Sequence, residues 1–402
     1  MPQGGESPSP ERQTGGQIHD PPGHGVHSKD KTSGQVQDAS KSNVEAIMAA
    51  QIPTTTKQWT ISSTDGSEGF DALKLSEVPV HPPGDSQVLV KMEAGSLNYR
   101  DLIIPLGKYP FAAKKDVIPG SDGAGTVIAV GKHVTRFQPG DAVITLFNQE
   151  HIGGPANAVN IMTGLGGAWD GTFRGVGAFS EQGLVHRPRA LSALEAATLP
   201  CAALTAWNAL YGDSGGRLTA GQWVLTQGTG GVSVAALQFA KAAGARVIAT
   251  TGSRDKEAAL TKLGADHVIN YRETPDWGVK ARDITGGVGV DHVVEVAGPT
   301  SMRQSINAVK TAGVITIIGF VGGTGDEKEP SFLECLSKLF TARGVLVGNR
   351  TQLEDMCRAI DANPERLRPV VDAKVFGLEQ LKEAYEYLYS GKHFGKVCIK
   401  MD

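Results

Sequence analysis

The second half of the chain alternates short apolar runs with stretches of helical periodicity. Gly221–Thr226 has the pattern of a buried strand, and Val234–Ala243 repeats its apolar residues at helical spacing. The alternation continues with strand patterns at Arg246–Thr250, His267–Asn270, Asp291–Val296 and Val314–Phe320, and with a helix pattern at Lys256–Leu263. Strands that are apolar throughout and joined by helices are typical of a parallel sheet covered on both faces. The pattern therefore predicts a doubly wound α/β domain.

The region before this alternation has short apolar runs that are broken by Gly and Pro. Gln87–Ala94 alternates like a half-buried strand, and Gly125–Val130 has the pattern of a second strand. Gln138–Thr145 is predicted to be a turn that leads into a third strand. These short strands predict a mainly β or α+β unit. The long, Gly-rich and weakly periodic stretch Asn148–Glu181 is predicted to be a functional or mobile loop.

The first 54 residues are predicted to form a disordered tail. Up to Asn43 the segment consists mainly of Gly, Pro, Ser, Gln, Asp, His and Lys, which bury too little surface to offset the entropy cost of ordering. It lacks the apolar core of a signal peptide. Its acidic residues are unlike a mitochondrial presequence, which avoids acids. We therefore expect a cytoplasmic protein.

Charge and cysteine usage narrow the classes of function. The 402 residues include 39 Lys or Arg and 42 Asp or Glu, so the net charge of -3 gives no bulk attraction to nucleic acid or to an anionic membrane. The four Cys residues are scattered without CxxC spacing, which argues against a disulfide framework or a thiolate-rich zinc site. No apolar run approaches the ~20 residues of a membrane span. We expect a small-molecule substrate and neither nucleic acid nor a membrane as partner.

The loop Gly228–Ser233 gives the clearest chemical signal. It follows a predicted strand and precedes a predicted helix, which is the context of a dinucleotide-binding loop. Gly228 allows a tight turn, and Gly230 lets the backbone approach a pyrophosphate at the helix N-terminus. Ser233 stands at the third fingerprint glycine, where a small residue still permits close packing. The predicted phosphate-binding residues are Gly228, Thr229, Gly230, Gly231 and Val232.

The end of the next predicted strand bears on the choice of nicotinamide cofactor. A site for NAD(H) places Asp or Glu about 20 residues after the loop, but Thr250–Gly252 contains no acid. Ser253, Arg254 and Lys256 follow instead, and these donors suit the 2′-phosphate of NADP(H). The pattern predicts NADP(H) in preference to NAD(H). The alternative interpretation is a solvated basic helix start, where Asp255 dilutes the positive field.

Six segments in a specific order and spacing resemble a known family; they are Ser96–Leu102, Ile118–Val130, Phe137–Val143, Gln227–Ser233, Leu263–Arg272 and His393–Ile399. From about residue 55 to residue 402 the chain resembles the medium-chain dehydrogenase/reductase superfamily. Within it, the chain is similar to the zinc-independent quinone oxidoreductase-like branch and to proteins labelled zinc-type alcohol dehydrogenase-like.

This resemblance implies a Rossmann domain inserted into a mainly β, GroES-like catalytic domain. The implied boundaries are 55–204 for the first part of the catalytic domain, 205–345 for the dinucleotide-binding domain and 346–402 for the return to the catalytic domain. Gly377–Met401 is expected to rejoin the first domain. The resemblance also implies a homodimer.

The resemblance implies that zinc is lost from this chain. Zinc enzymes of the superfamily hold the catalytic metal with a Cys, a His next to a Glu, and a second Cys or Asp. Asn98 stands at the first position, Ser121 and Asp122 stand at the His-Glu pair, and only Cys201 matches. One thiolate cannot form a three-ligand site. The four-Cys structural lobe is missing too, since no Cys precedes Cys201, and no metal site is expected.

By the same matching, Asn98 and Tyr109 are the candidate catalytic residues. Asn98 is expected near the nicotinamide, where its amide can donate to a carbonyl oxygen. Tyr109 matches a tyrosine that acts as proton donor in related enoyl reductases, and a neutral hydroxyl suits that role. The structural alternatives are an Asn98 that only stabilises a turn and a Tyr109 that is a packed aromatic.

Further cofactor contacts are expected from the resemblance. Tyr271 matches a residue at the 2′-phosphoadenosine end, and Thr205 matches one near the nicotinamide. Gly319, Phe320 and Val321 end a predicted strand where backbone groups meet the carboxamide. Lys396 is expected to reach the phosphates, with an exposed lysine at a strand end as the alternative.

Three functions follow from these observations. The first is an NADPH-dependent oxidoreductase of carbonyls, quinones or activated C=C bonds that transfers a hydride without zinc. The second is an enoyl reductase or ketoreductase that tailors secondary metabolites. The third is a non-enzymatic NADPH-binding protein on the same fold, against which the charge of -3 and the lack of a basic run count. A single sequence does not separate the first two, because pocket shape sets the substrate.

Overall fold

The computed structural model describes residues 52–212, 216–323 and 330–401. The predicted disordered tail lies outside these residues except for residues 52–54. No helix in these described ranges is both long and apolar enough to cross a membrane.

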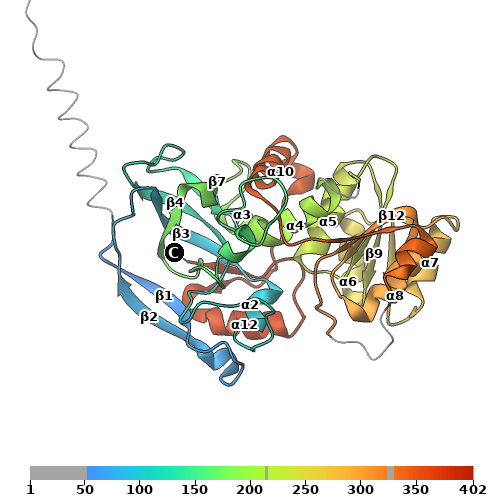
Figure 1. Ribbon diagram of the computed structural model, residues 1–402, viewed down its shortest axis with the longest axis horizontal. Helices are drawn as coiled ribbons and strands as arrows, with labels where there is room; N and C mark the ends of the chain where they lie inside the picture. The colour runs from blue at the N-terminus through green and yellow to red at the C-terminus, as the bar shows by residue number, and fades with distance from the viewer. Residues whose placement is uncertain (1–51, 213–215, 324–329, 402) are drawn as a thin grey trace, which may run out of the picture. The chain divides into compact units, whose positions relative to one another are not determined.

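The second half of the chain forms a six-stranded sheet in which every neighbouring pair is parallel. Figure 1 labels β9 and β12 of this sheet. Its spatial order is β10-β9-β8-β11-β12-β13. This is the strand order of a dinucleotide-binding Rossmann sheet, so the predicted doubly wound domain is confirmed. The strands are β8 (Trp223–Gln227), β9 (Arg246–Thr251), β10 (His267–Asn270), β11 (Val290–Glu295), β12 (Val309–Ile317) and β13 (Thr341–Gly344).

Helices cover both faces of this sheet because successive residues of each strand point to opposite sides. Val224 packs in one core with residues of helices α4, α5 and α10, whereas the adjacent Leu225 packs in another core with residues of α7 and α8. Val247 and Ile248 divide between the two cores in the same way. The helices are α4 (Leu204–Tyr211), α5 (Gly231–Ala242), α6 (Arg254–Lys262), α7 (Trp277–Ile284), α8 (Pro299–Ala308), α9 (Leu333–Lys338) and α10 (Arg350–Ala362).

The first half of the chain forms a mainly β domain, as predicted. Its larger sheet has the order β14-β15-β3-β4-β5-β7, with β6 also paired to β3. An antiparallel hairpin of β1 (Thr55–Ile61) and β2 (Leu73–Pro79) forms a separate two-stranded sheet. The strands of the larger sheet are β3 (Gln87–Ser96), β4 (Asp122–Val130), β5 (Ala142–Thr145), β6 (Val176–Ser180), β7 (Leu184–His186), β14 (Phe376–Gly377) and β15 (Cys398–Lys400).

Strands β6 and β12 differ from the sequence prediction. Strand β6 lies inside the stretch predicted as a loop, because its five residues pair antiparallel with the first half of β3. The pattern of such a short segment is too weak to show a partner so distant in the sequence. Strand β12 ends at Ile317 and not at Phe320 as predicted, so Gly319 and Phe320 lie in the loop after the strand.

The end of the chain joins the first sheet. Strand β15 pairs antiparallel with the end of β3, from Cys398 opposite Ser96 to Lys400 opposite Ala94. Helix α12 (Leu381–Tyr389) precedes it and lies against α2 (Tyr99–Ile103), as Figure 1 shows. This path brings together residues about 300 positions apart in the sequence. Leu97 N, for example, donates to Val397 O over 2.9 Å.

Candidate active site

A cavity of about 610 Å³ lies at the carboxyl ends of β8 and β9. Its walls include the Gly-rich loop after β8, the ends of β9 and β10, the start of α2, and the returning segment before β15. In an α/β sheet of this strand order, a ligand binds outside the carboxyl ends of the strands at this crevice. The cavity is therefore the candidate cofactor site.

The Gly-rich loop lies along the cavity as predicted for a phosphate-binding turn. Gly228 has φ of +73°, a conformation that favours glycine, and helix α5 begins at Gly231. A Cβ on Gly230 would meet no protein atom within 4 Å, and Gly230 is one of the residues that line the cavity. Ser233, at the third fingerprint position, donates from Oγ to Gln227 O over 2.5 Å and ties the helix to the end of β8.

The returning segment closes directly on this loop. Gly395 N donates to Thr229 O over 2.9 Å, and Gly395 and Gly230 form a parallel bridge. The buried stem of Lys396 runs past the first turn of α5, where a Cβ on Gly231 would lie 2.5 Å from the lysine Cδ. The Gly-rich loop therefore contacts Gly395 and Lys396 on one side and faces open space on the other.

Most of the residues predicted to bind the 2′-phosphate gather at the end of β9. Ser253, Lys256 and Tyr271 line the cavity. Lys256 donates from Nζ to Gly391 O and His393 O over 3.1 and 2.8 Å, and burial lowers the pKa of its ammonium. An ammonium has three donors, so one is left for a ligand.

Arg254 does not lie with them. Its guanidinium pairs with Glu273 over 2.5 Å, its side chain is 78% exposed, and it is not among the residues that line the cavity. Two residues that the sequence analysis did not select, Arg272 and His393, do line it. Both stand inside segments that had been matched to the family, and that position was the only available signal for them.

The residues expected around the nicotinamide divide into two groups. Val321 lines the cavity, whereas Thr205, Gly319 and Phe320 are not among its wall residues. Thr205 donates from Oγ1 to Cys201 O over 2.7 Å inside its own helical segment. The ring of Phe320 meets the ring of Tyr99 edge-on with centroids 6.3 Å apart, and Tyr99 is itself a wall residue.

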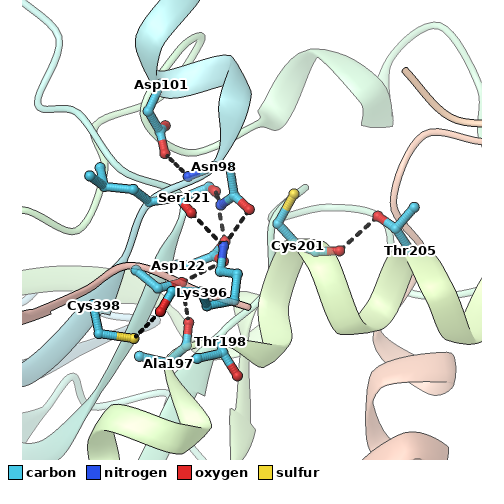
Figure 2. A network of polar contacts seen from close by, with 12 residues as sticks. Asn98, Asp101, Ser121, Asp122, Ala197, Thr198, Cys201, Thr205, Lys396 and Cys398 are labelled. Atoms are coloured by element: carbon cyan, nitrogen blue, oxygen red, sulfur yellow. Dashed lines mark hydrogen bonds and ion pairs between the residues drawn. The ribbon is translucent and has the colours of Figure 1, made fainter. Parts of the chain in front are cut away.

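The ammonium of Lys396 forms the centre of a buried polar network, which Figure 2 shows. Lys396 is 5% exposed and donates from Nζ to Leu97 O over 2.6 Å and to Asn98 Oδ1 over 2.5 Å. It also pairs with Asp122 Oδ2 over 3.3 Å. These protein oxygens surround the ammonium, and its expected contact with the cofactor phosphates stays a prediction.

The network fixes the orientation of the Asn98 amide. Since Oδ1 accepts from Lys396, Nδ2 points the other way and donates weakly to Ser121 Oγ over 3.4 Å. Ser121 in turn donates to Asp122 Oδ1 over 2.8 Å. Asn98 also lines the cavity, so its amide is an oriented donor at the cavity wall. Its backbone N–H donates to Asp101 Oδ2 at the start of α2.

The residues at this network do not fit a catalytic zinc ion. Asn98 and Ser121 offer an amide and a hydroxyl where zinc prefers imidazole or thiolate ligands. Burial raises the pKa of the Cys201 thiol, which keeps it neutral, and the Lys396 ammonium already supplies a cation there. In the part of the chain that the structure describes, no group of three His, Cys, Asp or Glu is placed to hold a metal ion.

Tyr109 lines a second, narrower cavity that shares no wall residue with the first one. Its hydroxyl accepts from Arg100 Nε over 3.3 Å, and its ring meets Phe111 edge-on. This cavity is lined by Arg100, Tyr109 and mainly apolar side chains that include Phe147 and Leu346. The two candidate catalytic residues, Asn98 and Tyr109, therefore line different cavities. Arg100, close to Asn98 in sequence, lines the narrow cavity and was not selected from the sequence.

Comparison with known proteins agrees with this architecture. Residues 84–193 match the alcohol dehydrogenase GroES-like domain, and residues 231–362 match the zinc-binding dehydrogenase domain. A zinc-type alcohol dehydrogenase-like protein of Schizosaccharomyces pombe is 45% identical over 343 residues, which cover 84% of this chain and 98% of the relative. The chain belongs to the medium-chain dehydrogenase/reductase family. It is therefore an oxidoreductase of the alcohol dehydrogenase and quinone oxidoreductase type.

Other members of the family share the fold across most of their length. The chloroplastic quinone-oxidoreductase QR1 of Triphysaria versicolor is 31% identical and covers 83% of this chain and 95% of its own. A solved NAD-dependent alcohol dehydrogenase has a TM-score of 0.76 at 32% identity, covering 86% of this chain and 100% of its own. The 2-octenoyl-CoA carboxylase reductase CinF, solved with NADP and 2-octenoyl-CoA, has a TM-score of 0.77 at 25% identity and covers 89% and 90%.

Proposed function

We propose that the protein is an NADPH-dependent, zinc-independent oxidoreductase that transfers a hydride to or from a carbonyl compound, a quinone or an activated C=C bond. When bound, the nicotinamide supplies or accepts the hydride. The chain itself has to bind the cofactor, orient the substrate oxygen and exclude water. Its cavity walls contain donors suited to each of the first two tasks.

The preference for NADPH rests on the charge of the cavity wall. Lys256 and Arg272 line the cavity near the end of β9, and no Asp or Glu is among its wall residues. A carboxylate after β9 would accept from the ribose hydroxyls of NADH and repel a 2′-phosphate. A Cβ on Gly252 would lie 2.4 Å from the Tyr271 hydroxyl, so an acidic residue there would also displace Tyr271. The similar solved structures include an NAD-dependent alcohol dehydrogenase and a reductase in complex with NADP, so they do not choose between the two cofactors. The assignment therefore rests on the residues that line the cavity of this chain.

Independence from zinc rests on the network around Lys396. In this proposal the Lys396 ammonium supplies the positive charge that a metal would otherwise supply. It donates to Asn98 Oδ1 and so orients the Asn98 amide. The oriented Nδ2 can donate to a substrate oxygen as negative charge develops on it, because preorganised donors in a site shielded from water stabilise such charge effectively. In this proposal Asn98 contacts the substrate and Lys396 is a positioning residue.

The charge of Lys256 provides the test of cofactor choice. We expect Lys256→Ala to weaken NADPH binding about 10- to 100-fold, since one charge-assisted hydrogen bond contributes about 1.5–3 kcal/mol. NADH binding should stay within about twofold of the wild type, because NADH has no 2′-phosphate. Titration calorimetry with both cofactors checks this.

Lys262→Ala is the matched control, because Lys262 is exposed at the far end of the same helix and is not a wall residue. It should leave both dissociation constants unchanged. If the wild type bound NADH and NADPH equally and Lys256→Ala altered neither, the NADPH assignment would be wrong.

We further propose that two copies of the chain associate through the edge of the Rossmann sheet. Strand β13 is the last strand in the sheet order. Next to it, Phe332, Leu333, Leu336 and Leu339 are all more than half exposed, with Phe332 at 90%. An exposed apolar patch beside an unpaired strand edge is a typical protein–protein contact. A second copy would pair with the edge and cover these side chains.

A further inference from the structure

A third cavity, of about 420 Å³, lies in the first domain and is not used by the proposed function. Residues between Gln87 and Ser180 line it, and it shares no wall residue with the cofactor cavity. Its walls combine apolar side chains, among them Leu165, Trp169 and Phe179, with a few polar and charged ones. A cavity of this size and composition suits a small organic ligand.

The guanidinium of Arg174 lies at the wall of this third cavity without a partner. Its Nε is buried and has no acceptor, and none of its nitrogens forms a hydrogen bond or an ion pair with the residues that the structure describes. Burial lowers the pKa of the group to about 10 although Asp170 opposes the change, so Arg174 stays charged at neutral pH. A buried donor without an acceptor destabilises the folded chain, and an acceptor from outside the chain would remove that cost.

The same guanidinium is already held in place in the free protein. Its Cζ lies 5.0 Å from the centroid of the Phe179 ring. Gly177 leaves room for the group, because a Cβ there would lie 2.5 Å from Arg174 Nε. The backbone at Arg174 forms an antiparallel bridge with Gln58 of β1 and is followed directly by β6. A cation that is ordered in advance loses little freedom when a ligand binds.

The charges of the wall indicate which acceptor fits. The other charged wall residues, Lys114 and Asp170, pair with each other over 2.5 Å. Asp170 Oδ1 also accepts from Ile118 N over 3.2 Å. Two cations and one carboxylate leave one net positive charge, and the guanidinium that carries it is unpaired. A single negative charge balances it, and the planar fork of an arginine matches the two oxygens of a carboxylate.

The aromatic part of the wall indicates an apolar body for this ligand. Trp169 is 38% exposed. Its backbone is fixed in a tight loop, since Trp169 N donates to Gly164 O over 3.1 Å and its carbonyl accepts from Gly166 N over 2.7 Å. A large exposed ring in a fixed position is a surface on which a flat aromatic group can pack. An inorganic anion would leave this ring uncovered.

We propose that the third cavity is a binding site for a small aromatic monocarboxylate, which places its carboxylate on Arg174 and its ring against Trp169. The site is separate from the cofactor cavity and does not depend on the hydride transfer proposed above. Its ligand therefore binds whether or not a nicotinamide cofactor is present. The unpaired cation gives the site its preference for an anion, and the exposed ring gives it a preference for an aromatic one.

A pair of probes that differ only in charge tests this proposal. The probe is 2-naphthoate, and its uncharged counterpart 2-naphthamide is the matched control. In titration calorimetry on the full chain, 2-naphthoate should bind at least about tenfold more tightly than 2-naphthamide, as expected for one charge-assisted hydrogen bond. Arg174→Met should abolish this difference. Arg174→Lys should restore only part of it, because lysine keeps the charge and loses the planar fork.

Further variants keep the test decisive. Gly177→Ala retains every charge but displaces the guanidinium, and should weaken 2-naphthoate binding severalfold. Arg187→Met removes a guanidinium that is paired with Glu93 elsewhere in the first domain, and should change neither dissociation constant. A wild type that binds both probes equally or binds neither, or an Arg174→Met protein with full affinity for 2-naphthoate, would overturn the proposal. Loss of 2-naphthoate binding in Lys256→Ala would place the probe in the cofactor cavity and would overturn it as well.

Discussion

Individual charges at this site have unusual surroundings, and Asp101 is the clearest case. Its carboxyl is buried at the start of α2, and burial raises its pKa from 3.8 to about 6, although Arg100 and the Asn98 backbone N–H oppose the change. Asp122 raises the pKa further and Lys396 lowers it. The carboxylate that balances Arg100 is therefore itself costly to ionise. The buried positive charge of Arg100 is therefore balanced by a carboxylate that loses its proton only at a higher pH than an exposed aspartate does.

This carboxyl should give the protein a measurable pH dependence. Since folded Asp101 keeps its proton to higher pH than the unfolded chain does, its contribution to stability falls as pH rises from about 4 to about 6. The interval between the two pKa values corresponds to about 3 kcal/mol. Urea unfolding of wild type and Asp101→Asn across this range should show the decline only in the wild type.

Asp65 provides a control of opposite sign. Hydrogen bonds from Ser63 and Ser67 lower its pKa to about 2 on an exposed turn. The stability that wild type gains over Asp65→Asn should therefore disappear as pH falls toward 2. Parallel pH curves for wild type and Asp101→Asn would show that Asp101 has an ordinary pKa.

At the scale of elements, the segment 393–396 joins the two domains of the fold. Its backbone pairs with the dinucleotide loop through Gly395 and Thr229, and its lysine orients Asn98. One short stretch therefore contacts both the Gly-rich loop and Asn98, the residue proposed to be catalytic. A change in its backbone should alter cofactor affinity as well as stability.

Gly395→Ala tests this coupling. Gly395 has φ of +73°, and a Cβ there would lie 2.3 Å from Val370 O. We expect a lower melting temperature and NADPH binding at least about tenfold weaker, since a displaced Gly395 loses its bond to Thr229. Gly287→Ala is the matched control, with φ of +85° and nothing within 4 Å of its Cβ. It should cost about 1–2 kcal/mol of stability from strain alone and leave NADPH affinity unchanged.

The elements themselves were largely predictable because their signals are local. Uniform apolar runs and helical spacing identify the Rossmann strands and helices, and strand–loop–helix context identifies the Gly-rich turn. Strand β6 was missed because its existence depends on pairing with β3, which lies some 90 residues earlier. In the same way, sequence does not show that Glu273 draws Arg254 out of the cavity while Lys256 turns into it. Side-chain direction at a helix start depends on neighbours from other segments.

At the scale of the whole molecule, the exposed patch beside β13 predicts the assembly. We expect a dimer in solution by light scattering, and Leu333→Glu with Leu336→Glu should convert it to a monomer because two buried carboxylates would oppose contact. The same double change at the exposed Val159 and Val279 serves as a control and should leave the mass of the wild type. A monomeric wild type would remove the dimer proposal and leave the cofactor site untouched.

The central claim is that this member of the family transfers hydride from NADPH without zinc, with Lys396 and Asn98 where metal chemistry would otherwise act. The most direct measurement is steady-state oxidation of NADPH and of NADH with a quinone or an enone, before and after exhaustive dialysis against a chelator. We predict unchanged turnover after dialysis and a kcat/KM at least about 100-fold higher with NADPH, as expected for two phosphate contacts, one from Lys256 and one from Arg272. Activity that is lost with the chelator and restored by zinc, or equal kcat/KM for both cofactors, would contradict the account.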